Sequence, residues 1–311
     1  MLASFILSFT VVPLVAYAAP LFGLGSSEAT GAPTPVSGST VNATLSRPAQ
    51  FARAAYCTSD SIKSWSCGVP CDSLKGVTFL QEGGDEGEVP FYFIAHDTVD
   101  QSLVVAHEGT DPDNILSILN DAEFALVNVD TTRIPQAAGK GIKVHDGFQQ
   151  TFQRTADGLL AGVKANLAST GIKKVVVTGH SLGGALATMT GAMIKAAVDP
   201  SVQVVVTTFG LPRGGNEAWA NFLDSNLGIT FVTNQNDPVP TLPPLLFGFT
   251  HSAGEIHIVD GSQTTIVSCP GHDNKNCVTG NSLLHLSVQN HLGPYFGLAD
   301  DITFGGDQCS S

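Results

Sequence analysis

One serine stands where its hydroxyl could act as a nucleophile. Ser181 is the centre of the pentapeptide GHSLG at 179–183, which follows the β-branched run 173–178 and precedes the helix-prone run 182–197. Glycines at both ends allow a sharp turn, and a strand–turn–helix arrangement projects the serine above a sheet. The helix would also direct free N–H groups at an anion formed there. This context predicts acyl-transfer chemistry and disfavours the alternative, a structural serine in a Gly-rich turn.

A nucleophilic serine needs a base to take its proton and an acid to orient that base. After a turn of this type the order along the chain is Ser, Asp, His. Asp237 directly follows the predicted strand 229–233, at a strand end where such sites are built, although it could be only an Asx–Pro turn residue. The other downstream acids are Asp199, Asp224, Asp260 and Asp273, and the downstream histidines are His251, His257, His272, His285 and His291. Spacing alone does not rank the histidines, and a buried structural role is the alternative for most of them.

Strands and helices alternate around these residues. Short apolar runs at 91–95 and 103–106, separated by polar residues, predict a two-stranded hairpin. Apolar residues recur at helical spacing from 148 to 167, and a further helix is expected around 217–223. Strands are predicted at 173–178, 202–207 and 229–233. This alternation predicts an α/β fold with a central, mostly parallel sheet flanked by helices.

Composition narrows the classes of protein. The chain has 311 residues, of which 43% are hydrophobic and 13% charged, so one catalytic domain with a substantial core is the simplest expectation. A formal net charge of −13 leaves no basic stripe for phosphates and argues against a nucleic-acid partner. The sequence calls for no cofactor and no metal.

The N-terminal residues are typical of an exported protein. An apolar run ending in Ala16-Tyr17-Ala18 predicts a signal peptide at 1–18. Lys and Arg are missing from its start, and a retained anchor is the alternative, but the run is short and interrupted by Pro13. The segment 19–46, rich in small and polar residues, is expected to be a linker or pro-segment before a catalytic domain at 47–311. Asn42 begins a glycosylation sequon.

Six cysteines form an even set that export would oxidise, so three disulfides are expected. They are Cys57, Cys67, Cys71, Cys269, Cys277 and Cys309. Fifteen pairings are possible. Short loops favour Cys67–Cys71 and Cys269–Cys277. Zinc is the alternative, but no second ligand pair matches the Cys67–Cys71 spacing.

Several segments in a fixed order resemble the fungal class 3 lipases of the Rhizomucor and Thermomyces type, a family that includes mono- and diacylglycerol lipases and feruloyl esterases. The segments are 54–57 (AAYC), 144–148 (VHDGF), 179–187 (GHSLGGALA), 209–216 (FGLPRGGN), 236–240 (NDPVP) and 291–297 (HLGPYFG). The resemblance covers nearly the whole chain after the linker. It implies an α/β-hydrolase fold.

The resemblance also assigns roles to individual residues. It implies that His291 is the base, that Asp237 orients it, and that Thr110 and the N–H of Leu182 form the oxyanion hole. It further implies a disulfide between Cys57 and Cys309. One departure is Glu108, which stands where the family usually has Arg, so the role of that Arg is not transferred.

The segment 111–119 follows the expected oxyanion residue. It reads as a short helix with Pro at its first position, and its apolar face consists of Ile115, Leu116, Ile118 and Leu119. The resemblance implies a lid that opens at a lipid–water interface. An ordinary amphipathic helix packed on the core is an equal alternative, because periodicity does not separate the two.

These observations leave three hypotheses for the function. The first is a secreted acylglycerol lipase, acting on tri-, di- or monoacylglycerols without an evident obligate protein partner. The second is a feruloyl esterase or another soluble-ester hydrolase, and the third is a non-catalytic binding member of the fold. Thr151, Phe152, Leu242 and Pro243 are expected to line an acyl groove. The apolar face of the expected lid favours the lipase, and the complete set of catalytic residues disfavours the third hypothesis.

Overall fold

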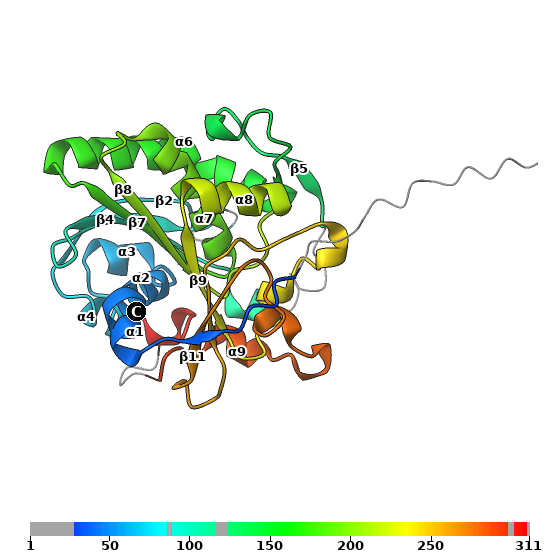
Figure 1. Ribbon diagram of the computed structural model, residues 1–311. Coiled ribbons are helices and arrows are strands. Elements are labelled where there is room, and N and C mark those ends of the chain that lie inside the picture. The colour runs from blue at the N-terminus through cyan, green and yellow to red at the C-terminus, as the bar shows by residue number, and fades with distance from the viewer. Residues whose placement is uncertain (1–27, 86, 88, 116–123, 298–301, 310–311) are drawn as a thin grey trace, which may run out of the picture.

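The computed structural model describes residues 28–85, 87, 89–115, 124–297 and 302–309. Within them a nine-stranded sheet has the order β1-β11-β10-β9-β8-β7-β4-β3-β2 (Figure 1). The central strands β10, β9, β8, β7 and β4 are parallel to one another. The two pairings at each edge of the sheet are antiparallel. The parallel centre agrees with the prediction, but the sheet as a whole is mixed because antiparallel strands extend both edges.

The strands of the large sheet have these bounds: β1 Thr34–Pro35, β2 Val77–Gly83, β3 Tyr92–Asp97, β4 Ser102–His107, β7 Lys174–His180, β8 Gln203–Phe209, β9 Ile229–Asn234, β10 Glu255–Ile258 and β11 Ile266–Cys269. The expected hairpin is β3 and β4. A separate two-stranded sheet joins β5 (Leu126–Asn128) to β6 (Lys143–His145). The expected strands 173–178, 202–207 and 229–233 correspond to β7, β8 and β9.

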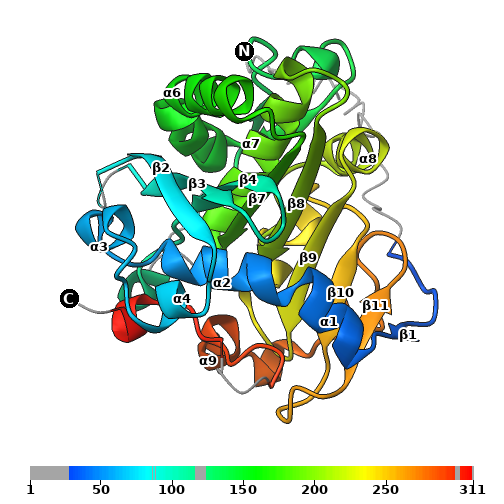
Figure 2. The ribbon, with the colours of Figure 1, turned by 90° about the vertical axis from the view of Figure 1, so that its left-hand side faces the viewer.

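Helices cover both faces of the sheet (Figure 2). The longer helices α6 (Asp146–Thr170), α7 (Leu182–Ala197) and α8 (Glu217–Asn226) lie on one face, and α1 (Gly38–Thr44) and α2 (Ser46–Ala54) lie on the other. The remaining helices are α3 Ser59–Lys63, α4 Val69–Asp72 and α9 Val288–Leu292, with 3₁₀ turns at Pro112–Asn114 (η1), Pro135–Ala137 (η2), Val239–Thr241 (η3), Leu245–Phe247 (η4), Val278–Gly280 (η5), Leu283–His285 (η6) and Gly306–Gln308 (η7).

Both faces of the parallel strands are buried, which explains their continuous apolar runs. Val175 and Val177 of β7 belong to the core beneath α6 and α7. Val176, between them, packs on the opposite side with Phe51 of α2. Successive side chains of a strand alternate between faces, so β7 contributes to two cores and its end is held firmly.

The N-terminal part of the described chain packs against the large sheet, and its assignment as a linker or pro-segment stays a prediction. β1 pairs with β11 at the edge of the sheet. Val41 and Leu45 are buried because, four positions apart, they lie on one face of the helical segment and join the core that contains Phe209. Packed structure therefore begins before the expected boundary at residue 47. The expected signal peptide at 1–18 lies outside the described residues.

All six cysteines are paired, as Cys57–Cys309, Cys67–Cys71 and Cys269–Cys277. The first pair joins the end of α2 to the end of the described chain, and the other two close short loops. These are the pairings that the short loops favoured and the resemblance implied. Asn42 is exposed on α1, and its glycosylation stays a prediction.

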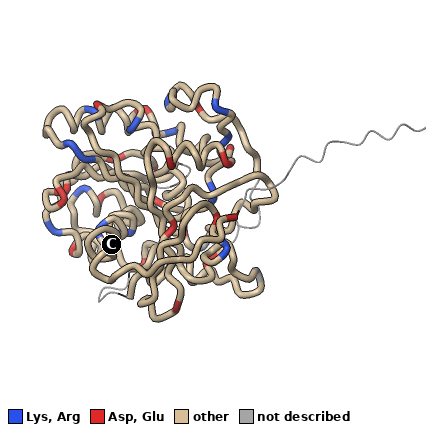
Figure 3. The backbone as a smooth tube through the Cα atoms, viewed as in Figure 1, with Lys and Arg blue, Asp and Glu red and all other residues tan. Residues whose placement is uncertain are grey.

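In the view of Figure 3, Lys and Arg positions are interspersed with Asp and Glu positions along the described chain. No helix within the described ranges is both long and apolar enough to cross a bilayer.

Candidate active site

Ser181 lies in the sharp turn between β7 and α7. Its backbone has φ 56° and ψ −126°, a conformation that costs energy for a residue other than glycine and that clusters at functional sites. The turn depends on its glycines: a Cβ at Gly179 would overlap the backbone of Gly183, and one at Gly183 would overlap the carbonyl of His107. The side chain is largely buried but borders a cavity. The local sequence therefore forms the strained turn that the pentapeptide predicted.

Asp237, three residues after the end of β9, and His291 of α9 are brought together. Nδ1 of His291 lies 2.9 Å from Oδ2 of Asp237, and Oδ1 of Asp237 accepts a hydrogen bond from the N–H of Val239 at 2.8 Å. Both side chains are fully buried. Because the carboxylate accepts, Nδ1 carries the proton and Nε2 has a free lone pair. Nε2 of His291 has no hydrogen-bond partner among the described residues. Its lone pair is therefore available to accept a proton.

The other downstream histidines have different partners. Nε2 of His251 bonds the carbonyl of Pro240, and Nδ1 of His257 bonds the hydroxyl of Thr233. His272 pairs with Asp224 at 2.6 Å near the surface, and His285 is exposed. Of the five downstream histidines, His291 is thus the one that the structure pairs with Asp237.

A further histidine, within the pentapeptide itself, supports this arrangement. Nδ1 of His180 lies 2.6 Å from the hydroxyl of Tyr56, and Nε2 lies 2.9 Å from the backbone oxygen of His291. Burial lowers the pKa of His180 well below its usual value, and the neighbouring His291 lowers it further. His180 is therefore neutral, donates from Nε2, and accepts from Tyr56. The role of His180 was missed at the sequence level, because nothing local indicates a partner 111 residues away.

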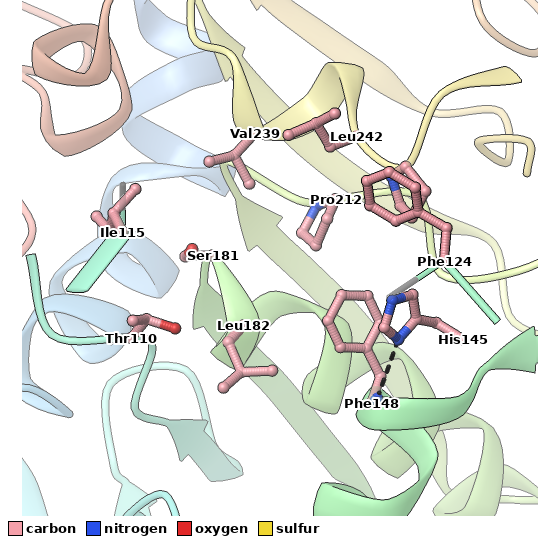
Figure 4. A pocket seen from close by; sticks show the side chains of 11 residues that line it. Thr110, Ile115, Phe124, His145, Phe148, Ser181, Leu182, Pro212, Val239 and Leu242 are labelled. Carbon is pink, nitrogen blue, oxygen red and sulfur yellow. Dashed lines mark hydrogen bonds between the residues drawn. The ribbon is translucent and has the colours of Figure 1, made fainter. Parts of the chain in front are cut away.

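Thr110 and Leu182 lie beside Ser181 and line the same cavity (Figure 4). Thr110 follows β4, and Leu182 is the first residue of α7. The loop after β4, which carries Thr110, lies against Tyr56. A Cβ added at Gly109 of this loop would overlap the hydroxyl of Tyr56. The structure thus places Thr110 and Leu182, the two expected oxyanion residues, next to Ser181, and their catalytic roles stay predictions.

Glu108, the departure from the family pattern, ties this loop to β3. Its Oε2 accepts the N–H of Phe91 at 2.8 Å, and its own N–H donates to the carbonyl of Phe91 at 2.9 Å. Glu108 therefore anchors the strand end that carries Thr110.

The cavity beside Ser181 has a volume of about 150 Å³ and mostly apolar walls. It is lined by Thr110, Ile115, Phe124, His145, Phe148, Ser181, Leu182, Pro212, Val239, Leu242 and Pro243. Leu242 and Pro243 were expected. Phe152 is instead buried in the core under α6, and the hydroxyl of Thr151 bonds the carbonyl of Gly147, so neither is among the lining residues.

His145 and Phe148 were not expected in the wall, although both belong to the VHDGF segment. Nδ1 of His145 caps the start of α6 by accepting the N–H of Phe148 at 3.3 Å, and the two rings stack with centroids 4.1 Å apart (Figure 4). The segment thus starts a helix and contributes two rings to the cavity.

The expected lid is described only at its start. Ile115 is buried and lines the cavity, directly after the 3₁₀ turn η1. Leu116, Ile118 and Leu119 lie outside the described residues. The assignment as a lid stays a prediction.

One group of potential metal ligands occurs among the described residues, formed by Glu255, Cys269 and Cys277. The two sulfurs are joined in a disulfide and so offer no thiolate ligands. The residues present do not fit a metal site.

Known proteins resemble this chain in sequence and in fold. Residues 104–247 match the model of the family described as lipase (class 3). A secreted mono- and diacylglycerol lipase of Malassezia globosa is 34% identical over 62% of this chain and 62% of its own length. A secreted mono- and diacylglycerol lipase of Fusarium solani is 30% identical over 80% of this chain and 74% of its own length.

The fold comparison agrees. The crystal structure of a lipase from Rhizopus microsporus var. chinensis superposes with a TM-score of 0.75 at 26% identity, covering 89% of this chain and 92% of that one. The expected family and α/β-hydrolase fold are confirmed. The chain belongs to the class 3 lipase family.

Proposed function

We propose that this protein is a secreted lipase that hydrolyses acylglycerols through an acyl-enzyme on Ser181. The observation that carries the proposal is the meeting of three features: a strained serine turn, a buried Asp237–His291 pair with a free Nε2, and an apolar cavity bordered by Ser181. The names of the Malassezia and Fusarium relatives support secretion and glyceride substrates.

In the proposed mechanism His291 acts first as a base. Its Nε2 takes the proton of Ser181 while Oγ attacks the ester carbonyl carbon. Asp237 holds the proton on Nδ1 and stabilises the imidazolium that forms. The hydroxyl and N–H of Thr110 and the N–H of Leu182 donate to the tetrahedral oxyanion.

Collapse of the tetrahedral intermediate breaks the bond between the carbonyl carbon and the alcohol oxygen. The alcohol leaves with the proton held on Nε2 of His291. Water then attacks the acyl-enzyme by the same steps in reverse, with His291 again as base, and the fatty acid is released. Apart from the attacking water, the groups in these steps come from the chain and the substrate.

The cavity walls favour an aliphatic acyl group. Apart from Ser181, the polar side chains in the lining are Thr110 and His145. An alkyl chain buries apolar surface there and needs no hydrogen-bond partner. A feruloyl group would bring a phenol hydroxyl and a methoxy oxygen into a wall that offers few partners, at a desolvation cost.

Exposed apolar residues continue from the cavity wall to the surface. Leu246 and Phe247 follow the lining residues Leu242 and Pro243 and are 68% and 52% exposed. The ring of Phe247 lies 5.3 Å from that of Phe124, which lines the cavity. Apolar side chains exposed beside a site mark a surface that contacts another apolar phase. This supports docking at a lipid–water interface.

The proposal is tested with a short-chain triacylglycerol and a diacylglycerol, assayed through their solubility limits beside methyl ferulate. We expect glyceride turnover that rises when the emulsion forms, slow ferulate turnover, and no activity in Ser181→Ala. Good ferulate turnover with a flat glyceride response would show a feruloyl esterase instead. A folded wild-type chain that binds an ester without hydrolysing it would show the non-catalytic alternative.

The assignment of the base has its own comparison. His291→Ala should abolish turnover, whereas His285→Ala changes an exposed residue outside the site and should not affect it. A fully active His291→Ala would disprove the assignment.

A further inference from the structure

A buried ion pair lies behind the cavity wall. Nε of Arg213 is 2.8 Å from Oδ1 of Asp273, and both side chains are almost completely inaccessible to solvent. Removing two charges from water costs several kcal/mol per ion, and their attraction need not restore that amount. Stability is therefore a weak reason for such a pair, and its hydrogen bonds to the segment 240–243 give another.

Arg213 holds three consecutive carbonyl groups of the wall. Its Nη1 donates to the carbonyl of Thr241 and, at 3.0 Å, to that of Pro243. Its backbone N–H donates to the carbonyl of Leu242 at 2.8 Å. Leu242 and Pro243 line the cavity, as does Pro212, which precedes Arg213. Figure 4 shows Leu242 and Pro212 on the wall next to Ser181.

Asp273 connects Arg213 to a second support of the same segment. Oδ2 of Asp273 accepts the N–H of His251 at 2.9 Å, and Nε2 of His251 lies 2.9 Å from the carbonyl of Pro240. Burial lowers the pKa of His251 to about 4, so the ring is neutral and donates from Nε2. The hydroxyl of Thr279 donates to Oδ1 at 3.2 Å. Asp273 thus contacts both residues, Arg213 and His251, that donate to the carbonyls from 240 to 243.

The position of Asp273 is itself constrained. It lies in the loop closed by Cys269–Cys277, with a left-handed φ of 44°. The segment that it supports starts three residues after Asp237, the partner of His291. A disulfide loop distant in sequence therefore holds the chain between the proposed catalytic acid and the acyl wall.

We infer that Arg213, anchored by Asp273, is a positioning residue that sets the acyl-chain preference by fixing Leu242 and Pro243 against the substrate chain. This inference rests on the proposed function. An acetyl group ends beside Ser181, whereas a longer acyl chain must run along the wall. Loosening the wall should therefore penalise long acyl groups selectively.

The first test is Arg213→Lys, which keeps the charge beside Asp273. One ammonium group does not reproduce the planar fork that serves the carboxylate and two carbonyls together. We expect kcat/KM on p-nitrophenyl octanoate to fall about tenfold, mainly through KM, and on p-nitrophenyl acetate by less than about twofold. Arg133→Lys is the matched control, because its fork likewise binds two groups, the partly buried Asp130 and the exposed Asp157, and none of the three residues lines the cavity. Its octanoate-to-acetate ratio should equal that of the wild type.

A merely structural role would lower both rates in proportion. An octanoate-to-acetate ratio of kcat/KM that stays at the wild-type value in folded Arg213→Lys would overturn the inference. If that variant does not fold, Thr279→Val decides: it removes a hydroxyl that bonds both Arg213 and Asp273. An octanoate-to-acetate ratio lowered at least about twofold supports the inference, and an unchanged ratio overturns it. A wild-type chain inactive on both esters would instead refute the proposed function.

Discussion

Nε2 of His180 lies 2.9 Å from the backbone oxygen of His291, and the centroids of the two rings are 4.3 Å apart. The residue before the proposed nucleophile thus supports the residue proposed as its base. Tyr56 completes the connection through Nδ1 of His180. Because Tyr56 donates there, His180 must donate from Nε2, and its contact with His291 is attractive.

Tyr56→Phe should weaken this support. The change leaves Nδ1 of His180 buried without a donor, which we expect to cost about 1–3 kcal/mol of stability. Turnover should fall while KM stays near its wild-type value, since the substrate contacts remain. Chemical denaturation and initial rates measure the two effects. Tyr92→Phe removes a hydroxyl from β3 and should leave turnover unchanged; equal losses in both variants would contradict the proposed connection.

Asp237→Asn should lower kcat by about 10⁴-fold, because an amide can donate to Nδ1 and favour the wrong tautomer of His291. KM should change little. The matched control is Asp224→Asn, which alters an Asp–His pair near the surface, formed with Nε2 of His272. Steady-state kinetics of both variants decide the matter: loss of activity in the control with an active Asp237→Asn would reverse the assignment.

Thr110→Val removes one proposed oxyanion donor and nearly preserves the side-chain volume. We expect kcat to fall about 100- to 1000-fold with a small change in KM. Thr44→Val, on the exposed part of α1, serves as the comparison and should keep full activity. Wild-type turnover in Thr110→Val would leave the backbone N–H groups as the sole donors.

Gly183→Ala should be destabilising by about 1–3 kcal/mol and poorly active, since the added methyl would overlap the carbonyls of His107 and Glu108. Gly38→Ala is the control, because a Cβ there meets no atom within 4 Å. That helical position should tolerate Ala with a change of less than about 1 kcal/mol. Thermal unfolding of both variants tests the comparison, which equal stabilities would refute.

Glu255 predicts a pH dependence of stability. Burial raises its pKa to about 7, although the hydroxyl of Thr233 and the N–H of Val278 bond its carboxyl group and oppose the rise. Its folded pKa exceeds the unfolded value, so its contribution is fully present below about pH 4.5 and is lost as the pH rises through about 7. The loss is on the order of 3 kcal/mol.

Glu255→Gln removes this titration. We expect the wild type to lose more stability than the variant between about pH 5 and about pH 8. The buried His107 and His251, whose pKa values burial lowers to about 3 and about 4, destabilise the fold as the pH falls below about 6.5. Both chains share that effect, so their difference reports Glu255 together with its neighbour His257, whose Nδ1 lies 3.9 Å away. Parallel stability curves across this range would disprove the raised pKa.

Sequence patterns between neighbouring residues predicted the turn at Ser181 and the helix α6. The glycines around Ser181, the β-branched run before it and the helix-prone run after it encode their turn within some twenty residues, and the structure has that turn as β7 and α7. Helical spacing likewise indicated α6. The packing of the segment before residue 47 was not indicated by the sequence, because Val41 and Leu45 are few among polar neighbours and become buried only against distant strands.

The sequence by itself determined the strand–turn–helix geometry around Ser181, since periodicity and backbone strain act between neighbouring residues. The spacing of the histidines did not select His291; the resemblance suggested it, and the packing of α9 beside the end of β9 decided that it meets Asp237. The contact between Arg213 and Asp273 likewise joins residues 60 positions apart. Only the tertiary structure decides such contacts, because they depend on how separate elements pack rather than on any local pattern.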